Sequence, residues 1–194
     1  MFDRKNFIDT SLKESSEIKL EVLRHCLADI NRAADLLVAS VKGGGKLMFC
    51  GNGGSAADCQ HIATEFMVRL SHDVKRKAIG AIALTTDSSN ITAGGNDIGF
   101  ENIFARNVEG LGRTGDVLIG ISTSGNSPNI LNALAKAKEM GIKTVGLLGK
   151  TGGKMKDACD ISVCIPSGNV QRIQESHITV GHILCEIVER ELGS

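Results

Sequence analysis

From residue 46 onward, short apolar runs alternate with segments of helical periodicity, and this alternation restricts the fold more than any other feature of the chain. Each run is bounded by glycine or polar residues and has the length of a buried strand. Strands that alternate with helices form parallel sheets whose two faces are covered by helices. The sequence therefore predicts an α/β fold built on one doubly wound, five-stranded parallel sheet.

The predicted elements form a single domain, residues 1–194, because no linker, repeat or low-complexity segment separates them. The strands are placed at Lys46–Cys50, Ala78–Leu84, Val117–Ile121, Thr144–Leu148 and Ile161–Ile165. The helices of this α/β core, residues 46–194, are placed near 55–70, 98–111, 128–140, 152–158 and 171–192. Ligands of such sheets bind beyond the carboxyl ends of the strands, so a site is expected in the loops there.

A long helical segment precedes the first strand. Apolar residues keep a three–four spacing from Leu23 to Val41, the helical pattern covers residues 9–42, and the glycines at 43–45 end it. So long an apolar seam exceeds what one small sheet can cover. We therefore expect residues 1–45 to form long helices that serve as an oligomerisation segment, with residues 12–41 at the core of a homo-oligomer.

The loop after the first strand has the residues of an anion site. The glycines of Gly51–Gly54 permit a tight turn that a ligand can approach closely. Ser55 is predicted to cap the helix that follows, and the N-terminus of a helix binds anions through free N–H groups and its dipole. His61 and Glu65 lie one turn apart on that helix, so we expect them to share a face.

The same loop also fits the dinucleotide fingerprint, as Gly51-x-Gly53-x-x-Ala56. That fingerprint needs an acidic residue about 20 positions further on, at the end of the second strand. Asp73 has the spacing but precedes that strand, whereas Asp87 has the place but comes too late. A nicotinamide cofactor is therefore the weaker alternative.

A second polar loop follows the third strand, and Pro128 suits the first turn of the helix after it. The loop has no lysine, which excludes a Walker loop and an NTPase. Neutral donors and a helix N-terminus suit one phosphate monoester, and the alternative is a turn that only caps its helix. We expect the phosphate site, because the loop lies where ligands bind. Its hydroxyl groups belong to Ser122, Thr123, Ser124 and Ser127.

Two more segments hold candidate residues. Asn96 and Asp97 lie between the second strand and its predicted helix. Turn chemistry alone could explain them, but their position at the edge of the sheet where ligands bind makes them candidates. Gln174 and His182 fall on roughly one face of the last helix but are about 12 Å apart along its axis. They reach one point only if their side chains lean together or if the helix begins after Gln174. His177, on the same helix, is expected to be structural or peripheral.

The composition excludes several kinds of partner. Basic and acidic residues balance at 22 each, so no overall field attracts nucleic acid or an anionic membrane. The chain has no Trp or Tyr and six Phe, which leaves almost no platform for stacking bases. No apolar stretch has the length of a membrane span, and the N-terminus is no signal peptide. The six cysteines form no Cys-x-x-Cys pair, so we expect reduced thiols in a cytoplasmic protein.

Four segments together resemble the sugar isomerase (SIS) domain family and, within it, the phosphoheptose isomerases. They are Cys-Gly-Asn-Gly-Gly-Ser at 50–55, Gly-Asn-Asp at 95–97, Gly-Ile-Ser-Thr-Ser-Gly-Asn-Ser at 120–127 and Arg-Ile-Gln-Glu-x-His at 172–177. The resemblance covers nearly the whole chain. It implies a flavodoxin-like sheet and a cytoplasmic homotetramer whose sites are shared between subunits.

The activity implied by this resemblance is the conversion of sedoheptulose 7-phosphate to D-glycero-D-manno-heptose 7-phosphate, the first step of bacterial ADP- or GDP-heptose biosynthesis. The reaction moves a proton between adjacent carbons through an enediol(ate), so it needs a base and a group that polarises the oxygens. Glu65 is expected to be the base and His182 the acid or polariser. The alternative is a non-catalytic SIS protein that binds phosphosugars or associates with the replication initiator DnaA, and such a protein would not need His61, Glu65 and His182 together.

The resemblance also implies ligands for the candidate residues. One zinc ion per subunit is implied at His61, Glu65, Gln174 and His182, whose nitrogen and oxygen donors suit zinc. A tightly bound zinc ligand is a poor base, so the two roles of Glu65 conflict. Contacts with the phosphorylated seven-carbon sugar are implied for Asn52, Gly53, Gly54, Glu65, Asn96, Asp97, Ser122, Thr123, Ser124, Ser127 and Gln174.

Overall fold

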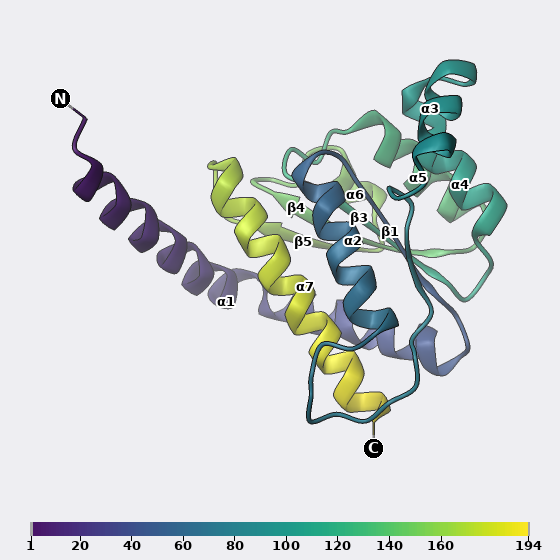
Figure 1. The fold of residues 1–194 in the computed structure, drawn as a ribbon, viewed down its shortest axis with the longest axis horizontal. Coiled ribbons are helices and arrows are strands. Elements are labelled where there is room, and N and C mark those ends of the chain that lie inside the picture. The colour runs from purple at the N-terminus through teal and green to yellow at the C-terminus, as the bar shows by residue number, and fades with distance from the viewer. Residues whose placement is uncertain (1, 194) are drawn as a thin grey trace.

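A computed structural model describes residues 2–193 and shows a parallel sheet between two layers of helices (Figure 1). The strands run in the order β2-β1-β3-β4-β5, and every neighbouring pair is parallel. This is the flavodoxin-like order, so the predicted doubly wound sheet is confirmed. The strands are β1 (Leu47–Gly51), β2 (Ala81–Ala83), β3 (Val117–Ser122), β4 (Lys143–Gly149) and β5 (Ile161–Ile165).

Most helices follow their strands as predicted. They are α2 (Gly54–Met67) after β1, α5 (Pro128–Glu139) after β3, α6 (Met155–Ala158) after β4 and α7 (Val170–Leu192) after β5. The predicted cap at Ser55 is wrong: α2 begins one residue earlier, and the N–H of Ser55 already bonds to the carbonyl of Asn52 at 3.0 Å. The turn depends on Gly53, whose φ of 56° lies in the left-handed region that glycine tolerates.

The segment after β2 differs from the prediction of one helix over 98–111. It forms α3 (Ser88–Asp97), a 3-10 turn at Phe100–Asn102 and α4 (Ile103–Leu111). Asp87 caps α3 by accepting a hydrogen bond from the N–H of Asn90 at 3.0 Å, which offsets the low helix propensity of the Gly94–Gly95 pair. Strand β2 is also shorter than predicted, since only Ala81–Ala83 pair with β1.

The two helical layers bury opposite faces of the sheet. Along β1, Leu47 and Phe49 face the layer made by α1, α2 and α7, whereas Met48 and Cys50 face α4, α5 and α6. The alternation follows from the period of two along a strand. All six cysteines are free thiols, four of them buried. Within residues 2–193, no helix combines the length and hydrophobicity needed to cross a bilayer.

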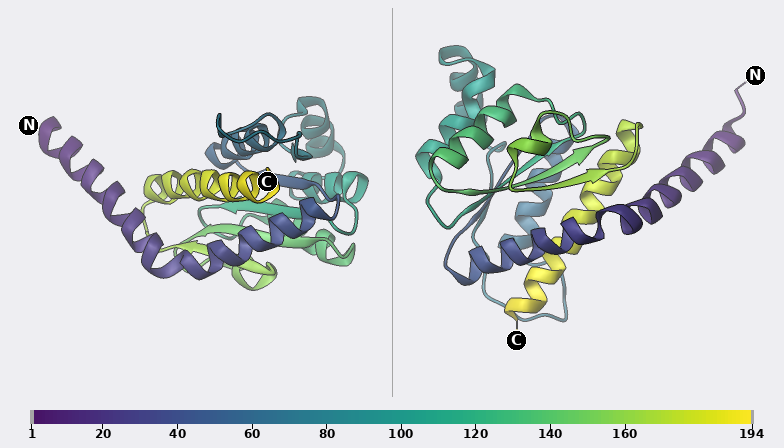
Figure 2. Two further views of the ribbon diagram at one scale, coloured as in Figure 1. Left: turned by 90° about the horizontal axis from the view of Figure 1, so that it is seen from below. Right: turned by 180° about the vertical axis from the view of Figure 1, so that it is seen from behind.

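The N-terminal segment is one helix, α1 (Arg4–Lys42), rather than several. It begins earlier than predicted because Asp3 caps it by accepting a hydrogen bond from the N–H of Asn6 at 3.0 Å. Its C-terminal half packs against β5 and α7, whereas its N-terminal end extends away from the rest of the chain (Figures 1 and 2).

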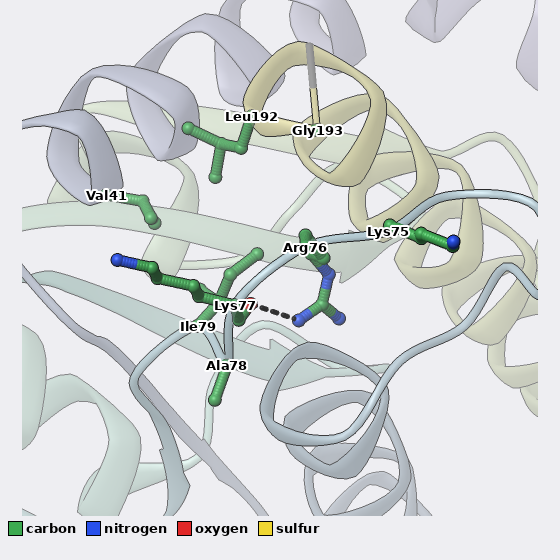
Figure 3. A pocket seen from close by; sticks show the side chains of 8 residues that line it. All are labelled: Val41, Lys75, Arg76, Lys77, Ala78, Ile79, Leu192 and Gly193. Carbon is green, nitrogen blue, oxygen red and sulfur yellow. Dashed lines mark hydrogen bonds between the residues drawn. The ribbon is translucent and has the colours of Figure 1, made fainter.

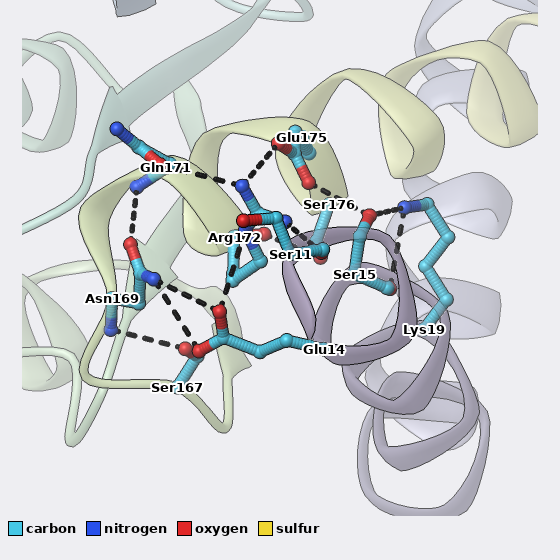
Figure 4. Close-up of polar contacts among 10 residues, drawn as sticks. All are labelled: Ser11, Glu14, Ser15, Lys19, Ser167, Asn169, Gln171, Arg172, Glu175 and Ser176. Atoms are coloured by element: carbon cyan, nitrogen blue, oxygen red, sulfur yellow. Dashed lines mark hydrogen bonds and ion pairs between the residues drawn. The ribbon is translucent and has the colours of Figure 1, made fainter. Parts of the chain in front are cut away.

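Polar contacts fix the direction in which α1 leaves the domain (Figure 4). The buried side chain of Arg172, at the start of α7, donates a hydrogen bond to the carbonyl oxygen of Ser11. Ser15 Oγ donates to Glu175 at 2.8 Å. These bonds join the first half of α1 to the first turns of α7.

Candidate active site

Helices α2 and α7 lie side by side on one face of the sheet and bring three predicted side chains together (Figure 1). His61 Nε2 lies 2.8 Å from His182 Nε2 and 3.4 Å from Glu65 Oε1. The three donor atoms lie within 4.8 Å of one another. The side chain of Glu65 is 19% exposed and that of His61 is 49% exposed, so the carboxylate lies at the covered end of the group.

This donor set fits a zinc ion. Two imidazoles and one carboxylate are the protein ligands of a common type of catalytic zinc site, in which the fourth position stays open. The short contact between His61 and His182 is a hydrogen bond, so one of the two rings carries its proton on Nε2. A metal ion would replace that proton, because imidazole binds metals as the neutral acceptor.

Gln174 contacts a different part of α2. Its amide packs so closely on Gly54 that a Cβ there would collide with Nε2. Helix α7 begins at Val170, so Gln174 lies inside the helix and not before it. Among residues 2–193, no hydrogen bond joins Gln174 to His61, Glu65 or His182, and its amide lies beside Asp58.

Asp58 is a site residue that the sequence pattern did not single out. Its Oδ2 is buried and has no hydrogen-bond partner among the described residues. Burial raises the pKa of this carboxyl group, and the Gln174 amide and His61 act in the opposite direction. The only signal in the sequence was its place three residues after Ser55, which is typical of the first turn of a helix.

An amide pair joins the loop after β1 to the helix after β3. Asn52 Nδ2 donates to Asn129 Oδ1 at 2.9 Å, and Asn129 Nδ2 donates to Asn52 Oδ1 at 2.8 Å. Asn129 is 2% exposed and was not predicted. The pair spans β1 and β3, the neighbouring strands at which the sheet changes direction, where ligands bind in such folds. Asn52, expected to contact substrate, is thus held in place by a second amide.

The predicted phosphate loop is folded around its hydroxyl groups. Ser122 Oγ lies 3.1 Å from Ser127 Oγ and accepts a hydrogen bond from the N–H of Gly125 at 3.1 Å. Ser127 occupies the N-cap position of α5, but its side chain makes no capping hydrogen bond. The alternative, in which these serines only cap the helix, is therefore wrong for Ser127. The side chain of Thr123 is half-buried, and that of Ser124 is exposed.

Asn96 and Asp97 lie in the last turn of α3 and not in a loop before a helix. Both are exposed, and Asn96 Nδ2 donates to Asp97 Oδ1 at 2.6 Å. Among residues 2–193, no hydrogen bond joins either residue to the loops after β1 and β3. No hydrogen bond among the described residues therefore ties Asn96 and Asp97 to the other candidates.

His177 is fully buried, as a structural residue should be. Its Nε2 donates to the carbonyl oxygen of Leu148 at 3.0 Å, which leaves Nδ1 as an acceptor without a partner among the described residues. Burial lowers the pKa of His177 to about 4. The ring is therefore neutral at neutral pH.

Both acidic residues of the dinucleotide alternative already have polar partners. Asp87 caps α3. Asp73 Oδ2 lies 3.5 Å from Arg190 Nη2, in the loop between α2 and β2. The glycine loop of the dinucleotide fingerprint is present, but the acidic residue that the fingerprint requires about 20 positions further on, at the end of the second strand, is missing.

The chain is similar to known proteins over almost its whole length. The SIS domain profile matches residues 12–149. The phosphoheptose isomerase of Clostridium acetobutylicum is 51% identical over 190 residues, which cover 97% of this chain and 96% of that protein. The phosphoheptose isomerase of Pelodictyon phaeoclathratiforme is 50% identical over 187 residues, which cover 96% of this chain and 88% of that protein.

Two solved structures have the same fold over almost the whole chain. A phosphoheptose isomerase from Neisseria gonorrhoeae superposes with a TM-score of 0.90 at 38% identity, covering 97% of this chain and all of that one. A phosphoheptose isomerase from Francisella tularensis gives a TM-score of 0.93 at 35% identity with the same coverage.

Proposed function

Because this chain belongs to the SIS-domain family and is an isomerase of the phosphoheptose isomerase type, we propose that it converts sedoheptulose 7-phosphate to D-glycero-D-manno-heptose 7-phosphate. This would be the first step of bacterial ADP- or GDP-heptose biosynthesis, in the cytoplasm. The observation that carries the proposal is the convergence of Glu65 with His61 and His182, on two neighbouring helices of a chain about half identical to phosphoheptose isomerases.

Glu65 is the proposed base and His182 the proposed acid or polariser. The carboxylate takes a proton from one of two adjacent carbons and returns it to the other, while the imidazole donates to the neighbouring oxygens. A carboxylate base paired with a histidine electrophile performs the related reaction in triosephosphate isomerase. The partly covered position of Glu65 suits a base that must be shielded from bulk water.

The phosphate is proposed to bind at the loop after β3. The hydroxyl groups of Ser122 and Ser127 gather before the first turn of α5 without any lysine, and that helix N-terminus favours an anion. Further sugar contacts are proposed for Asn52, Gly53, Gly54, Asn96, Asp97, Thr123, Ser124 and Gln174.

One zinc ion per subunit is proposed at His61, Glu65 and His182, with Gln174 as a fourth ligand if its side chain turns away from Gly54. A bound zinc ion would supply Lewis-acid polarisation of the sugar oxygens. The conflict at Glu65 stays open to test: a strong zinc bond would weaken it as a base.

The chain is proposed to form a homotetramer through α1. Leu20, Leu23 and Leu27 are 52%, 58% and 60% exposed, and such apolar side chains on one helix mark an interaction surface. Light scattering at micromolar concentration should give four times the chain mass. A monomer mass would refute the assembly.

Replacing Glu65 by glutamine tests the chemistry. Glutamine keeps the size of the side chain but cannot accept the proton, so turnover of sedoheptulose 7-phosphate should fall by at least about 10²–10⁴-fold. The matched control is Glu186→Gln, which removes an exposed carboxylate that pairs with Arg190 on α7. Both variants should be assayed with chelator and with added zinc, and near wild-type turnover of Glu65→Gln in both conditions would show that Glu65 is not the base.

Binding tests the phosphate loop separately from turnover. The phosphorylated ketose should raise the melting temperature, whereas the unphosphorylated sugar should not. Equal shifts from both would remove the phosphate site, and a shift from NAD would favour the dinucleotide alternative. A wild-type protein that binds the phosphorylated sugar but forms no aldose in any metal condition would be a non-catalytic SIS protein.

A further inference from the structure

A buried ion pair joins Arg76, in the loop between α2 and β2, to Glu189, near the C-terminal end of α7. The side chains of Arg76 and Glu189 are 2% and 0% exposed, and Arg76 Nη2 lies 2.6 Å from Glu189 Oε1. The carboxylate also accepts hydrogen bonds at 2.9 Å from the N–H groups of Leu70 and Ser71. No sequence motif marks this segment, yet its arginine is one of the most buried charges in the chain.

Arg76 also holds the end of α2. Its Nη2 donates to the carbonyl oxygen of Glu65 at 2.7 Å, and its Nη1 donates to the carbonyl oxygen of Lys77 at 3.0 Å. Figure 3 shows this arginine beside an open pocket, with its bond to Lys77 drawn. Because the last carbonyl groups of a helix have no partner within it, the guanidinium group satisfies the backbone of the residue proposed as the base.

Glu189 holds the matching position on α7. It lies seven residues after His182, close to two full turns, so both side chains leave the same face of the helix about 10 Å apart. The helices also touch closely beside the histidine pair: a Cβ on Gly181, next to His182, would collide with Ile62, next to His61. One helix therefore presents His182 to His61, and two turns later the same face presents Glu189 to Arg76.

We propose that Arg76 and Glu189 are positioning residues for the isomerase site. The pair joins the backbone of Glu65 to α7 and so sets the distance between Glu65 and His182. Neither side chain reaches the reacting atoms. The inference rests on the proposed function for its meaning, but it concerns the geometry of the helix pair, which can be measured without substrate.

We call the Arg76–Glu189 pair, with its hydrogen bond to the Glu65 carbonyl, the clamp. Two variants, the clamp variants, separate this hydrogen-bonding role from the effect of charge alone. Arg76→Lys keeps a positive charge for Glu189 but lacks the planar fork that reaches the Glu65 carbonyl. Glu189→Gln keeps the shape and removes the charge. The matched control is Asp116→Asn: Asp116 is also buried and accepts hydrogen bonds from Lys46 and Arg113, but none of these residues belongs to α2 or α7.

Turnover should be measured well below the melting temperature of each variant. We expect kcat to fall about 10–100-fold in Arg76→Lys and Glu189→Gln, as for other residues that orient a site through a neighbour. KM should change less than about twofold, because the proposed phosphate loop lies between β3 and α5 and no hydrogen bond within residues 2–193 joins it to the clamp. Asp116→Asn should lower the melting temperature but leave kcat unchanged.

The second readout is the ring NMR signals of His61 and His182 in protein with labelled histidines and no metal. These signals should move in both clamp variants and stay in place in Asp116→Asn. Unchanged ring signals and kcat in the clamp variants would overturn the proposal and leave a purely stabilising ion pair. An inactive wild type whose ring signals still move in the variants would refute the proposed function and support the clamp.

Discussion

Replacing His177 by glutamine should flatten the dependence of stability on pH between about pH 6.5 and pH 4. The ring is fully buried and donates from Nε2 to the carbonyl oxygen of Leu148. Burial lowers its pKa from 6.5 to about 4, because a charged imidazolium would lie in the core without a second partner. Glutamine keeps an amide donor for Leu148 but has no proton to gain.

The size and sign of the effect follow from the two pKa values. Below pH 6.5 the unfolded chain takes up a proton that the folded chain does not take up until about pH 4, so stability falls with pH across this range. Well above pH 6.5 the ring is neutral in both the folded and the unfolded chain, so none of this stability is lost. At about 1.4 kcal/mol per pKa unit, the loss reaches about 1.4 kcal/mol at about pH 5.5 and about 2.6 kcal/mol at about pH 4.5.

Urea unfolding of both proteins at several pH values between about 7.5 and 4.5 measures this term. One protein concentration must be used throughout, because association adds to apparent stability, and a chelator removes the pH dependence of metal binding. The free energy of unfolding of the wild type minus that of His177→Gln should decrease by the amounts above as the pH falls. A constant difference would refute the reasoning, since the titrations of all other groups cancel in the subtraction.

Three further outcomes are expected. Asn129→Ala should raise the KM for the sugar phosphate and lower the free energy of unfolding by about 1–3 kcal/mol, because Asn52 loses both amide bonds; steady-state kinetics and urea unfolding check this. Gly125→Ala should lower the melting temperature, because the φ of 65° is strained for alanine and its Cβ would collide with the Gly152 carbonyl. Zinc affinity, measured by competition with a chelating dye, should fall about 10-fold or more in His61→Ala, because one of the three converging donors is lost.

The sequence by itself determined the fold class and most element positions. The apolar runs, the glycine turn before α2 and Pro128 at the start of α5 are local signals, since each depends on neighbours within one or two turns. The pairing of His61 with Glu65 was local in the same way, because both lie on one helix. The SIS resemblance then added His182, which spacing alone left undecided.

Local signals failed where a polar side chain or the backbone changed the outcome. The left-handed Gly53 moved the start of α2 ahead of Ser55. The Asp87 cap formed α3 from a glycine-rich segment that was expected to be a turn, and so placed Asn96 and Asp97 inside a helix. In both cases the sequence correctly indicates a helix boundary, but the position of the boundary depends on which backbone groups find hydrogen-bond partners.

Only the tertiary structure decided the contacts that hold the site together. Asn52 meets Asn129 across 77 positions of sequence, and Arg76 meets Glu189 across 113. No periodicity joins residues so far apart; they meet because the parallel sheet brings separate loops to one edge and packs α2 beside α7. The chain thus encodes its chemical groups locally, whereas the distances between them come from burial, which requires that each polar group left inside finds a partner.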